Sequence, residues 1–310
     1  MKRRNFLKKG LFLSLSSAMA PAFLPGSGNL YAEPKVKRPA VEEWKNTEIN
    51  VAWIGHATVL INFYGKIIIT DPVLFNSVGV YMFGFTYGPQ RLIPPAITVY
   101  DMPKPDLVLL SHAHMDHMDY LTLSEIADKY PGQIDCITAY NTADVIADLE
   151  WKSLHEMDWG QQYSLPGLHF KALEVKHFGW RYPWERDRSK GFFSNGRSFN
   201  AYVIERNGKK ILFGGDTAFT DKFKKSGEKV DIAIMPIGAY NPWVKAHCNP
   251  EEALQMAREM DAKVFIPIHF YTFRQGWEPR DEPLKRLLKA KDSFAMHIGV
   301  TEVGGTYNTA

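Results

Sequence analysis

Ser111-His112-Ala113-His114-Met115-Asp116-His117 decides the fold, because it places four potential metal ligands within six consecutive positions. It follows Asp106-Leu107-Val108-Leu109-Leu110, an apolar run that is typical of a buried strand. Zinc accepts neutral imidazoles and carboxylates, and a rigid strand end can hold several of them around one ion. A single histidine is more often an ordinary core or surface residue, but this whole set would be repulsive or idle without a cation. The sequence therefore predicts a metal site at the end of this strand.

The pattern His112-x-His114-x-Asp116-His117 resembles the signature of the metallo-β-lactamase-fold hydrolases. The resemblance implies an α/β fold, a four-layer αββα sandwich, with the site at the edge of its two sheets. It also implies a His after a further strand, an Asp in a Gly-Asp turn and a His near the C-terminus. The candidates, which all follow apolar, strand-like runs, are His177, Asp216 and His269.

The resemblance also implies how these side chains would share two zinc ions, with other divalent metals as alternatives. One ion would be held by His112, His114 and His177, the other by Asp116, His117 and His269, and Asp216 would bridge them. Such a pair lowers the pKa of a shared water, to about 7 in one-zinc sites, and presents hydroxide to an ester or phosphoester. Asp116 would then be catalytic by orienting the hydroxide, and neither a serine nor a cysteine nucleophile is needed.

Further segments resemble the branch that includes N-acylphosphatidylethanolamine-hydrolysing phospholipase D, from about Trp53 to Pro283. They are Trp53-x-Gly55-His56-Ala57-Thr58, Pro94-Pro95, Pro236-Ile237-Gly238-Ala239-Tyr240 and His247-x-Asn249-Pro250-Glu251-Glu252-Ala253. This implies an exported phosphodiesterase of the phospholipase D type for N-acylphosphatidylethanolamine-like lipids. His247 would be catalytic by polarising a substrate oxygen; a structural hydrogen bond is its alternative. Asp71 resembles the aspartate that orients the histidine cluster from behind, with a plain turn residue before proline as the alternative.

Three other functions stay open. A lactonase or phosphoesterase for a small soluble substrate is favoured if residues 75–95 fill the site instead of opening it. A di-iron redox protein is disfavoured, because such relatives usually have a glutamate where His114 stands and because the chain shows no flavin-binding extension. A non-catalytic metal-binding protein is disfavoured because no ligand is missing.

The N-terminus has the pattern of an export signal. Arg3-Arg4-Asn5-Phe6-Leu7-Lys8 resembles the twin-arginine signal, and the apolar run after it falls short of the ~20 residues of a spanning helix. Cleavage is expected after Ala20 or Ala32, and an uncleaved anchor is the alternative. We expect a signal peptide at 1–32, a linker at 33–43 and the hydrolase domain at 44–310. The twin-arginine export machinery would be a partner, and the location periplasmic or otherwise exported.

Charge and cysteine content narrow the function classes. The formal net charge is +3, but the leader carries five basic residues and no acidic one, so the rest of the chain carries −2. A nucleic-acid partner would need a basic patch on the folded domain and is not expected. A peripheral membrane contact is left open. Cys136 and Cys248 are too few for a disulfide framework, and we expect two free, at least partly buried thiols.

Apolar alternation and turn residues predict most of the remaining elements. Helices are expected at Tyr120–Tyr130, from Asn141 or Thr142 to Leu149, and from an Asn249 cap to about Met260. Strands are expected at Asn50–Ile54, Thr58–Phe63, Lys66–Thr70, Asp135–Ala139, Leu168–Val175, Phe199–Glu205, Lys209–Phe213 and Asp231–Ile237.

Two aromatic segments are candidates for substrate contact. Phe75–Pro95 has no sustained period and indicates an irregular apolar lip, or an insertion on the domain's own surface. The stretch after His177 carries both aromatic and basic side chains, which would build an apolar wall and hold a phosphate. The alternative is a solvated loop whose arginines pair with Glu185 and Asp187.

Overall fold

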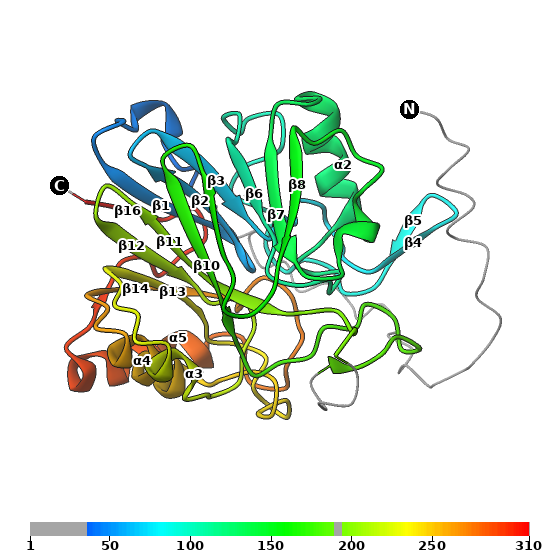
Figure 1. Ribbon diagram of the computed structural model, residues 1–310. Helices are drawn as coiled ribbons and strands as arrows, with labels where there is room; N and C mark the ends of the chain where they lie inside the picture. Colours follow the sequence, from blue (N-terminus) through cyan, green and yellow to red (C-terminus); the bar gives the residue numbers. More distant parts are fainter. Residues whose placement is uncertain (1–35, 189–193, 310) are drawn as a thin grey trace.

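The computed structural model describes residues 36–188 and 194–309 and forms the predicted αββα sandwich (Figure 1). The expected signal peptide and residues 33–35 of the expected linker lie outside the described residues. Val36 and Val41 of that linker already pack against the core. No helix within the two described ranges has the length and apolarity needed to cross a membrane.

The first sheet has the strand order β16-β1-β2-β3-β6-β7-β8. Its strands are β1 (Ile49–Gly55), β2 (Thr58–Phe63), β3 (Lys66–Thr70), β6 (Leu107–Leu109), β7 (Asp135–Ala139), β8 (Ser153–Met157) and β16 (Thr306–Asn308). Neighbours from β16 to β3 are antiparallel, and those from β3 to β8 are parallel.

The second sheet has the order β15-β14-β13-β12-β11-β10-β9. Its strands are β9 (Gln162–Leu165), β10 (Leu168–Glu174), β11 (Asn200–Arg206), β12 (Lys209–Phe213), β13 (Ile232–Pro236), β14 (Val264–Ile268) and β15 (His297–Ile298). Here too an antiparallel half, β9 to β12, adjoins a parallel half, β12 to β15. The strands predicted from the sequence are confirmed to within a residue or two.

Helices cover the outer faces of both sheets (Figure 1). α2 (Tyr120–Lys129) lies on the first sheet, and α3 (Lys222–Lys225), α4 (Pro250–Glu259) and α5 (Glu282–Ala290) lie on the second. Short 3-10 turns are η1 (Val41–Glu43), η2 (Ala143–Val145) and η4 (Lys291–Phe294). The predicted capping box of α4 is confirmed: Asn249 accepts from the Glu252 backbone, and the Glu252 side chain accepts from the Asn249 backbone.

The predicted helix from residue 142 to Leu149 is wrong. Only η2 forms there, because the Thr142 side chain does not cap it and donates instead to the Ala139 carbonyl. Glu156 of β8 accepts from the Thr142 and Ala143 backbones, and the Trp151 indole donates to the Ile146 carbonyl. These contacts hold the segment in a tight turn. They also engage backbone groups that a longer helix would need for its own hydrogen bonds.

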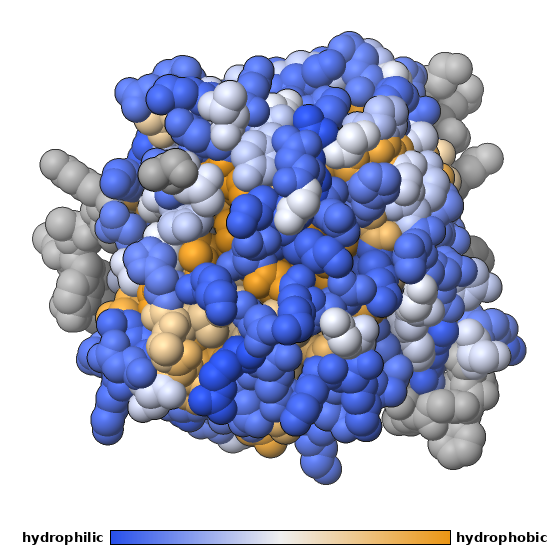
Figure 2. All heavy atoms as spheres, turned by 60° about the vertical axis from the view of Figure 1, so that its left-hand side comes forward, coloured by the Kyte–Doolittle hydropathy of each residue, from blue (hydrophilic) through white to orange (hydrophobic). Residues whose placement is uncertain are grey.

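The segment 75–95 is also more regular than expected. It contains a two-stranded hairpin of β4 (Val80–Met82) and β5 (Phe85–Tyr87), which lies at the edge of the molecule outside the two large sheets (Figure 1). Figure 2 shows a different face of the molecule, where hydrophilic residues predominate and hydrophobic ones show only in small areas between them.

The two sheets pack face to face around one large core. Trp53 of β1 stacks on Phe270, which follows β14, with ring centroids 4.6 Å apart. Tyr202 of β11 donates its hydroxyl to the Leu110 carbonyl after β6, at 3.1 Å. These contacts between the sheets fix the ends of the strands that carry the metal-ligand candidates. Cys136 and Cys248 are both buried and free, as predicted.

Candidate metal centre

The structure brings all seven predicted metal ligands to one edge of the sandwich. His112 to His117 follow β6, and the other ligands follow strands of the second sheet. His177 comes after β10, Asp216 after β12 and His269 after β14. Strand ends from both sheets therefore supply side chains to a single site.

The turn that carries Asp216 packs directly on the histidine loop. Gly215 has a φ of +56°, and a Cβ on it would lie 2.7 Å from the Ser111 Cβ and 2.9 Å from the Asn200 carbonyl oxygen. Only glycine fits both the left-handed conformation and this close approach. The Gly-Asp turn is thus a geometric requirement for bringing the carboxylate to the histidines.

Three imidazoles form the first ligand group. His112 Nε2 lies 2.8 Å from His114 Nδ1, and His177 Nε2 lies 3.2 Å from the same His114 atom. His177 Nδ1 donates to the Ala246 carbonyl at 2.9 Å, which leaves its Nε2 lone pair facing the other two rings. Three ring nitrogens that converge in this way fit a metal ion with nitrogen ligands.

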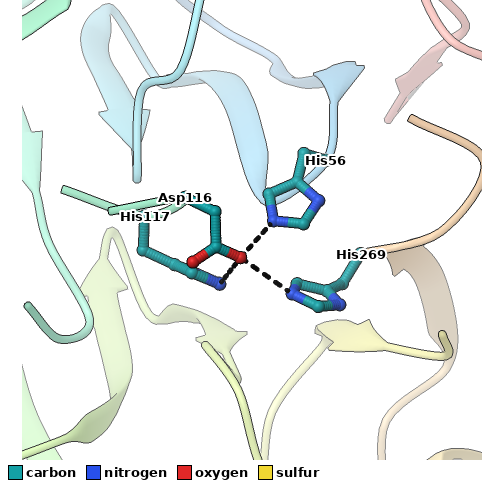
Figure 3. A group of neighbouring side chains, drawn as sticks. All are labelled: His56, Asp116, His117 and His269. Atoms are coloured by element: carbon teal, nitrogen blue, oxygen red, sulfur yellow. Dashed lines mark hydrogen bonds and ion pairs between the residues drawn. The ribbon is translucent and has the colours of Figure 1, made fainter. Parts of the chain in front are cut away.

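The second group contains Asp116, His117 and His269, and one residue that was not predicted as part of the site, His56 (Figure 3). Asp116 lies among the three imidazoles with one oxygen turned toward them. That oxygen, Oδ2, is 2.9 Å from His56 Nε2, 3.5 Å from His117 Nε2 and 3.6 Å from His269 Nε2. Gln275 also donates to Asp116 Oδ2, at 2.5 Å.

Asp216 lies between the two groups. Its Oδ2 is 3.0 Å from His117 Nε2, 3.1 Å from His269 Nε2 and 3.9 Å from His177 Nε2. This position fits the bridging role that the family resemblance implies. His247 is close as well, with Nδ1 3.8 Å from the same oxygen and a side chain that is 12% exposed.

Asp71 lies behind the cluster and orients it, as the resemblance implies. Its fully buried carboxylate accepts from the Ser111 backbone at 2.7 Å and from the Ser111 hydroxyl at 2.5 Å. It also accepts from His117 Nδ1 at 2.7 Å, which turns His117 Nε2 toward Asp216. A carboxylate in this position fixes the ring orientation and raises the basicity of the imidazole.

The electrostatics of the site favour the metal-binding protonation state in five of the seven ligand candidates. Burial lowers the pKa of His114 to about 4 and the pKa of His112 and His177 well below the usual value, so all three are neutral ligands. Burial opposes ionisation of Asp116 and Asp216, but the neighbouring histidines outweigh it and hold the pKa of both carboxyls well below the usual range. The first group thus offers free lone pairs and the second offers negative charge.

The remaining two ligands carry protons where the second cation would lie. Burial works against protonation of His269, but the Asp216 carboxylate outweighs it and raises the pKa to about 9. His117 has a raised pKa for the same reason, with Asp216 and Asp116 as the opposing charges. A metal ion would replace these protons as the positive charge between the carboxylates.

Unsatisfied buried atoms give the direct test of whether a metal fits. Within the described residues, the buried atoms without a hydrogen-bond partner include His247 Nδ1 and Asp216 Oδ1, together with His117 Nε2 and His269 Nε2, which face Asp216 Oδ2 at 3.0 and 3.1 Å without the geometry of a hydrogen bond. Each such atom costs about 1–3 kcal/mol when it is left unpaired. Their concentration in one place fits a cation that would satisfy several of them at once.

A cleft of about 380 Å³ leads to the cluster. Phe178 and Trp180 line it, as predicted for an aromatic wall, together with Tyr87, the last residue of β5. His114 and Asp116 line it as well. A second cleft of about 490 Å³ reaches His269 from the 270–280 segment, and Gln275 lines both.

The arginines after His177 are engaged within the protein. Arg181 donates from Nη1 to the Ala113 carbonyl at 2.7 Å and to the Met118 carbonyl at 3.0 Å. It therefore holds in place the loop that carries His112 to His117, called the metal loop below. Arg188 pairs with Asp158 at 2.8 Å and lies over the Trp159 ring. Both therefore serve the fold, although these partners are backbone carbonyls and Asp158 instead of the Glu185 and Asp187 of the alternative interpretation. Lys190, Phe192 and Phe193 lie outside the described residues.

Fold and site together define a class of protein: the chain belongs to the β-lactamase superfamily of metal-dependent hydrolases. The family model described as "Beta-lactamase superfamily domain" matches residues 67–270. N-acyl-phosphatidylethanolamine-hydrolyzing phospholipase D 1 of Caenorhabditis elegans is 32% identical over 261 residues, which cover 78% of this chain and 70% of that protein. The mitochondrial N-acyl-phosphatidylethanolamine-hydrolyzing phospholipase D of Saccharomyces cerevisiae is 26% identical over 80% of this chain and 53% of its own length.

Solved structures support the same fold. A metallo hydrolase from the archaeon Ignicoccus hospitalis matches with a TM-score of 0.62 and 20% identity, over 85% of this chain and 99% of that one. The isothiocyanate hydrolase from Delia radicum gut bacteria matches with a TM-score of 0.63 and 18% identity, over 84% of this chain and 98% of that one. At this identity the likeness concerns the fold alone.

Proposed function

We propose that this protein is an exported zinc-dependent phosphodiesterase of the phospholipase D type that acts on N-acylphosphatidylethanolamine-like lipids. The observation that carries the proposal is the 380 Å³ cleft, whose aromatic side chains adjoin His114 and Asp116 of the metal-ligand cluster. A lipid needs an apolar wall for its chains and a cationic site for its phosphodiester. The similarity to the phospholipase D of C. elegans supports the same substrate class.

Two divalent ions would be held by the two ligand groups, with Asp216 in contact with both. Metal bound there would supply Lewis acidity and lower the pKa of water. The first group is His112, His114 and His177, and the second is Asp116, His117 and His269. His56 and Gln275 both contact Asp116 Oδ2, so they would fix the direction of that carboxylate.

His247 would bind the substrate as a neutral hydrogen-bond donor. Burial lowers its pKa to about 4, so the ring is uncharged at neutral pH and one of its nitrogens carries a proton. Its Nδ1 has no hydrogen-bond partner among the described residues and lies 3.8 Å from Asp216. A neutral imidazole here can donate to a phosphoryl oxygen.

The test incubates the zinc-loaded protein with N-acylphosphatidylethanolamine in mixed micelles and identifies the products by mass spectrometry. Asp216→Asn serves as the blank, because it keeps the side-chain shape and removes the charge between the two groups. Phosphatidic acid and N-acylethanolamine from the wild type alone would support the proposal. Hydrolysis of a soluble phosphodiester or lactone without any lipid turnover would instead support the small-substrate alternative.

Export is tested separately in cells. Arg3→Lys combined with Arg4→Lys should hold the protein in the cytoplasm, because the twin-arginine pathway reads the arginine pair. Cell fractionation measures this, and unchanged export of the double variant would argue against the proposed route.

A further inference from the structure

The β4–β5 hairpin belongs to an unusually apolar stretch of surface chain. No charged residue occurs from Pro72 to Gln90. Exposure is greatest at the tip and decreases along β5: Phe83 is 90% exposed, Phe85 69% and Tyr87 54%. Exposed single hydrophobic residues are common on proteins, but three aromatic side chains on one uncharged hairpin form a patch that indicates a binding surface.

The turn at the tip uses a residue that the backbone disfavours. Phe83 has a φ of +52° and Gly84 a φ of +88°, a two-residue turn with both residues left-handed. Such turns favour Asn-Gly or Asp-Gly, because a bulky side chain is strained at positive φ. Nothing buries the Phe83 side chain in return, since it is the most exposed large hydrophobic residue in the described chain. A residue that is strained in the backbone and gains no packing in return indicates a functional role.

The base of the hairpin is fixed, so the tip is held outward. The Arg91 backbone donates to the Asn76 carbonyl at 2.8 Å, and its guanidinium donates to the Phe75 carbonyl at 2.9 Å. Val78 and Val73, below the strands, form a small buried cluster with Phe273. The aromatic tip is therefore presented to solvent by an anchored base.

We propose that the β4–β5 hairpin docks this protein on a phospholipid bilayer by inserting Phe83 and Phe85 among the lipids. The narrow tip has Phe at its end and Tyr87 further back. This order fits insertion into a bilayer, because phenyl rings enter the apolar layer and Tyr side chains stay near the headgroups. A stable contact with a second protein would need a broad surface of about 800 Å² per partner, whereas this hairpin presents a projecting point.

The hairpin also connects the bilayer to the metal-ligand cluster. Val78, Val80 and Tyr87 line the same cleft as His114 and Asp116. A lipid that leaves the membrane beside the inserted tip would thus meet the cluster through the cleft that these hairpin side chains line. The inference rests on the proposed function only in this last step, because docking itself requires no turnover.

The test measures sedimentation of the full-length protein with vesicles of equal parts phosphatidylcholine and phosphatidylethanolamine. Phe83→Asn with Phe85→Thr removes both rings while it supplies an Asn-Gly turn and a good strand residue. The matched control is Tyr100→Ser. Tyr100 is a 77% exposed aromatic residue whose carbonyl accepts from Lys129 at the C-terminal end of α2, whereas the metal loop precedes the N-terminus of that helix.

We expect the double variant to partition onto vesicles at least about tenfold more weakly than the wild type, and the control to be unchanged. The wild-type partition should also be the same at low and high salt, because the hairpin carries no charge. Equal binding of the double variant and the wild type, or no binding by either, overturns the inference. A dimer in light scattering that the double variant abolishes would also overturn it, in favour of self-association.

Turnover separates this inference from the proposed function. If the wild type binds vesicles through the hairpin but releases no N-acylethanolamine, the docking holds and the substrate assignment fails. If the wild type hydrolyses the lipid in micelles and the double variant binds vesicles equally well, the function holds and the docking fails.

Discussion

Replacing Asp71 by Asn should weaken metal binding without unfolding the protein. The Asp71 carboxylate is fully buried, accepts two hydrogen bonds from Ser111 and accepts a third from His117 Nδ1 at 2.7 Å. An amide has nearly the same shape but only one oxygen. One of these bonds must therefore be lost, or the amide must point an N–H at a group that itself donates.

The magnitude follows from the role of the contact. Loss of a carboxylate that supports a ligating histidine typically lowers metal affinity by about 10- to 100-fold. That range corresponds to about 1.4–2.7 kcal/mol of binding free energy. Most of the effect should fall on the ion that His117 would hold, because Asp71 fixes which nitrogen of His117 faces the cluster.

The assay is competition for zinc against a chromophoric chelator, with circular dichroism to monitor folding. Asp135→Asn is the matched control, because Asp135 is also buried and accepts from Lys152 and Ser153, but at the start of β7 and away from the site. The control should keep wild-type zinc affinity. If Asp71→Asn binds both ions as tightly as the wild type, the assigned role of Asp71 is wrong.

Two further predictions concern the proton on His269 and the hydrogen bonds by which Arg181 holds the metal loop. Because the pKa of His269 is raised to about 9, metal-free protein holds that proton at neutral pH and must release it when metal binds, so affinity should fall as pH falls below about 9. Calorimetric heats of zinc binding should therefore depend on the ionisation enthalpy of the buffer, and buffer-independent heats would contradict the assignment. Arg181→Met should lower the free energy of unfolding by about 2–4 kcal/mol, because it removes two hydrogen bonds from a half-buried cation to the carbonyls of Ala113 and Met118. Urea denaturation measures this. A loss below about 0.5 kcal/mol, as at ordinary surface sites, would contradict the stabilising role of Arg181.

Local signals explain why most strands and seven metal-ligand candidates could be predicted. Tyr64-Gly65 and Asn207-Gly208 mark hairpin turns, and the apolar runs between such signals give strands whose ends differ by one or two residues at most. The ligands each follow one of these runs, so the chain order already indicated a common sheet edge. A spaced motif thus specified both the fold and the site.

The parts that were missed depend on contacts between distant residues. His56 and Gln275 reach Asp116 from 60 and 159 positions away, and neither contact has a local pattern. The turn at 143–145 is capped by Glu156, which belongs to a later strand. β8 and β9 lie near sheet edges and are only partly buried, so their sequences show little apolar alternation. Tertiary partners decided these features.

The proposed function requires that the clustered side chains hold two metal ions. The most direct measurement is anomalous diffraction from crystals of the zinc-loaded protein, collected above and below the zinc absorption edge. Two zinc peaks are predicted, one at about 2.0–2.1 Å from the nitrogens of His112, His114 and His177, the other beside Asp116, His117 and His269, with Asp216 in contact with both. A single peak, a peak elsewhere, or none at this edge of the sandwich would contradict the account.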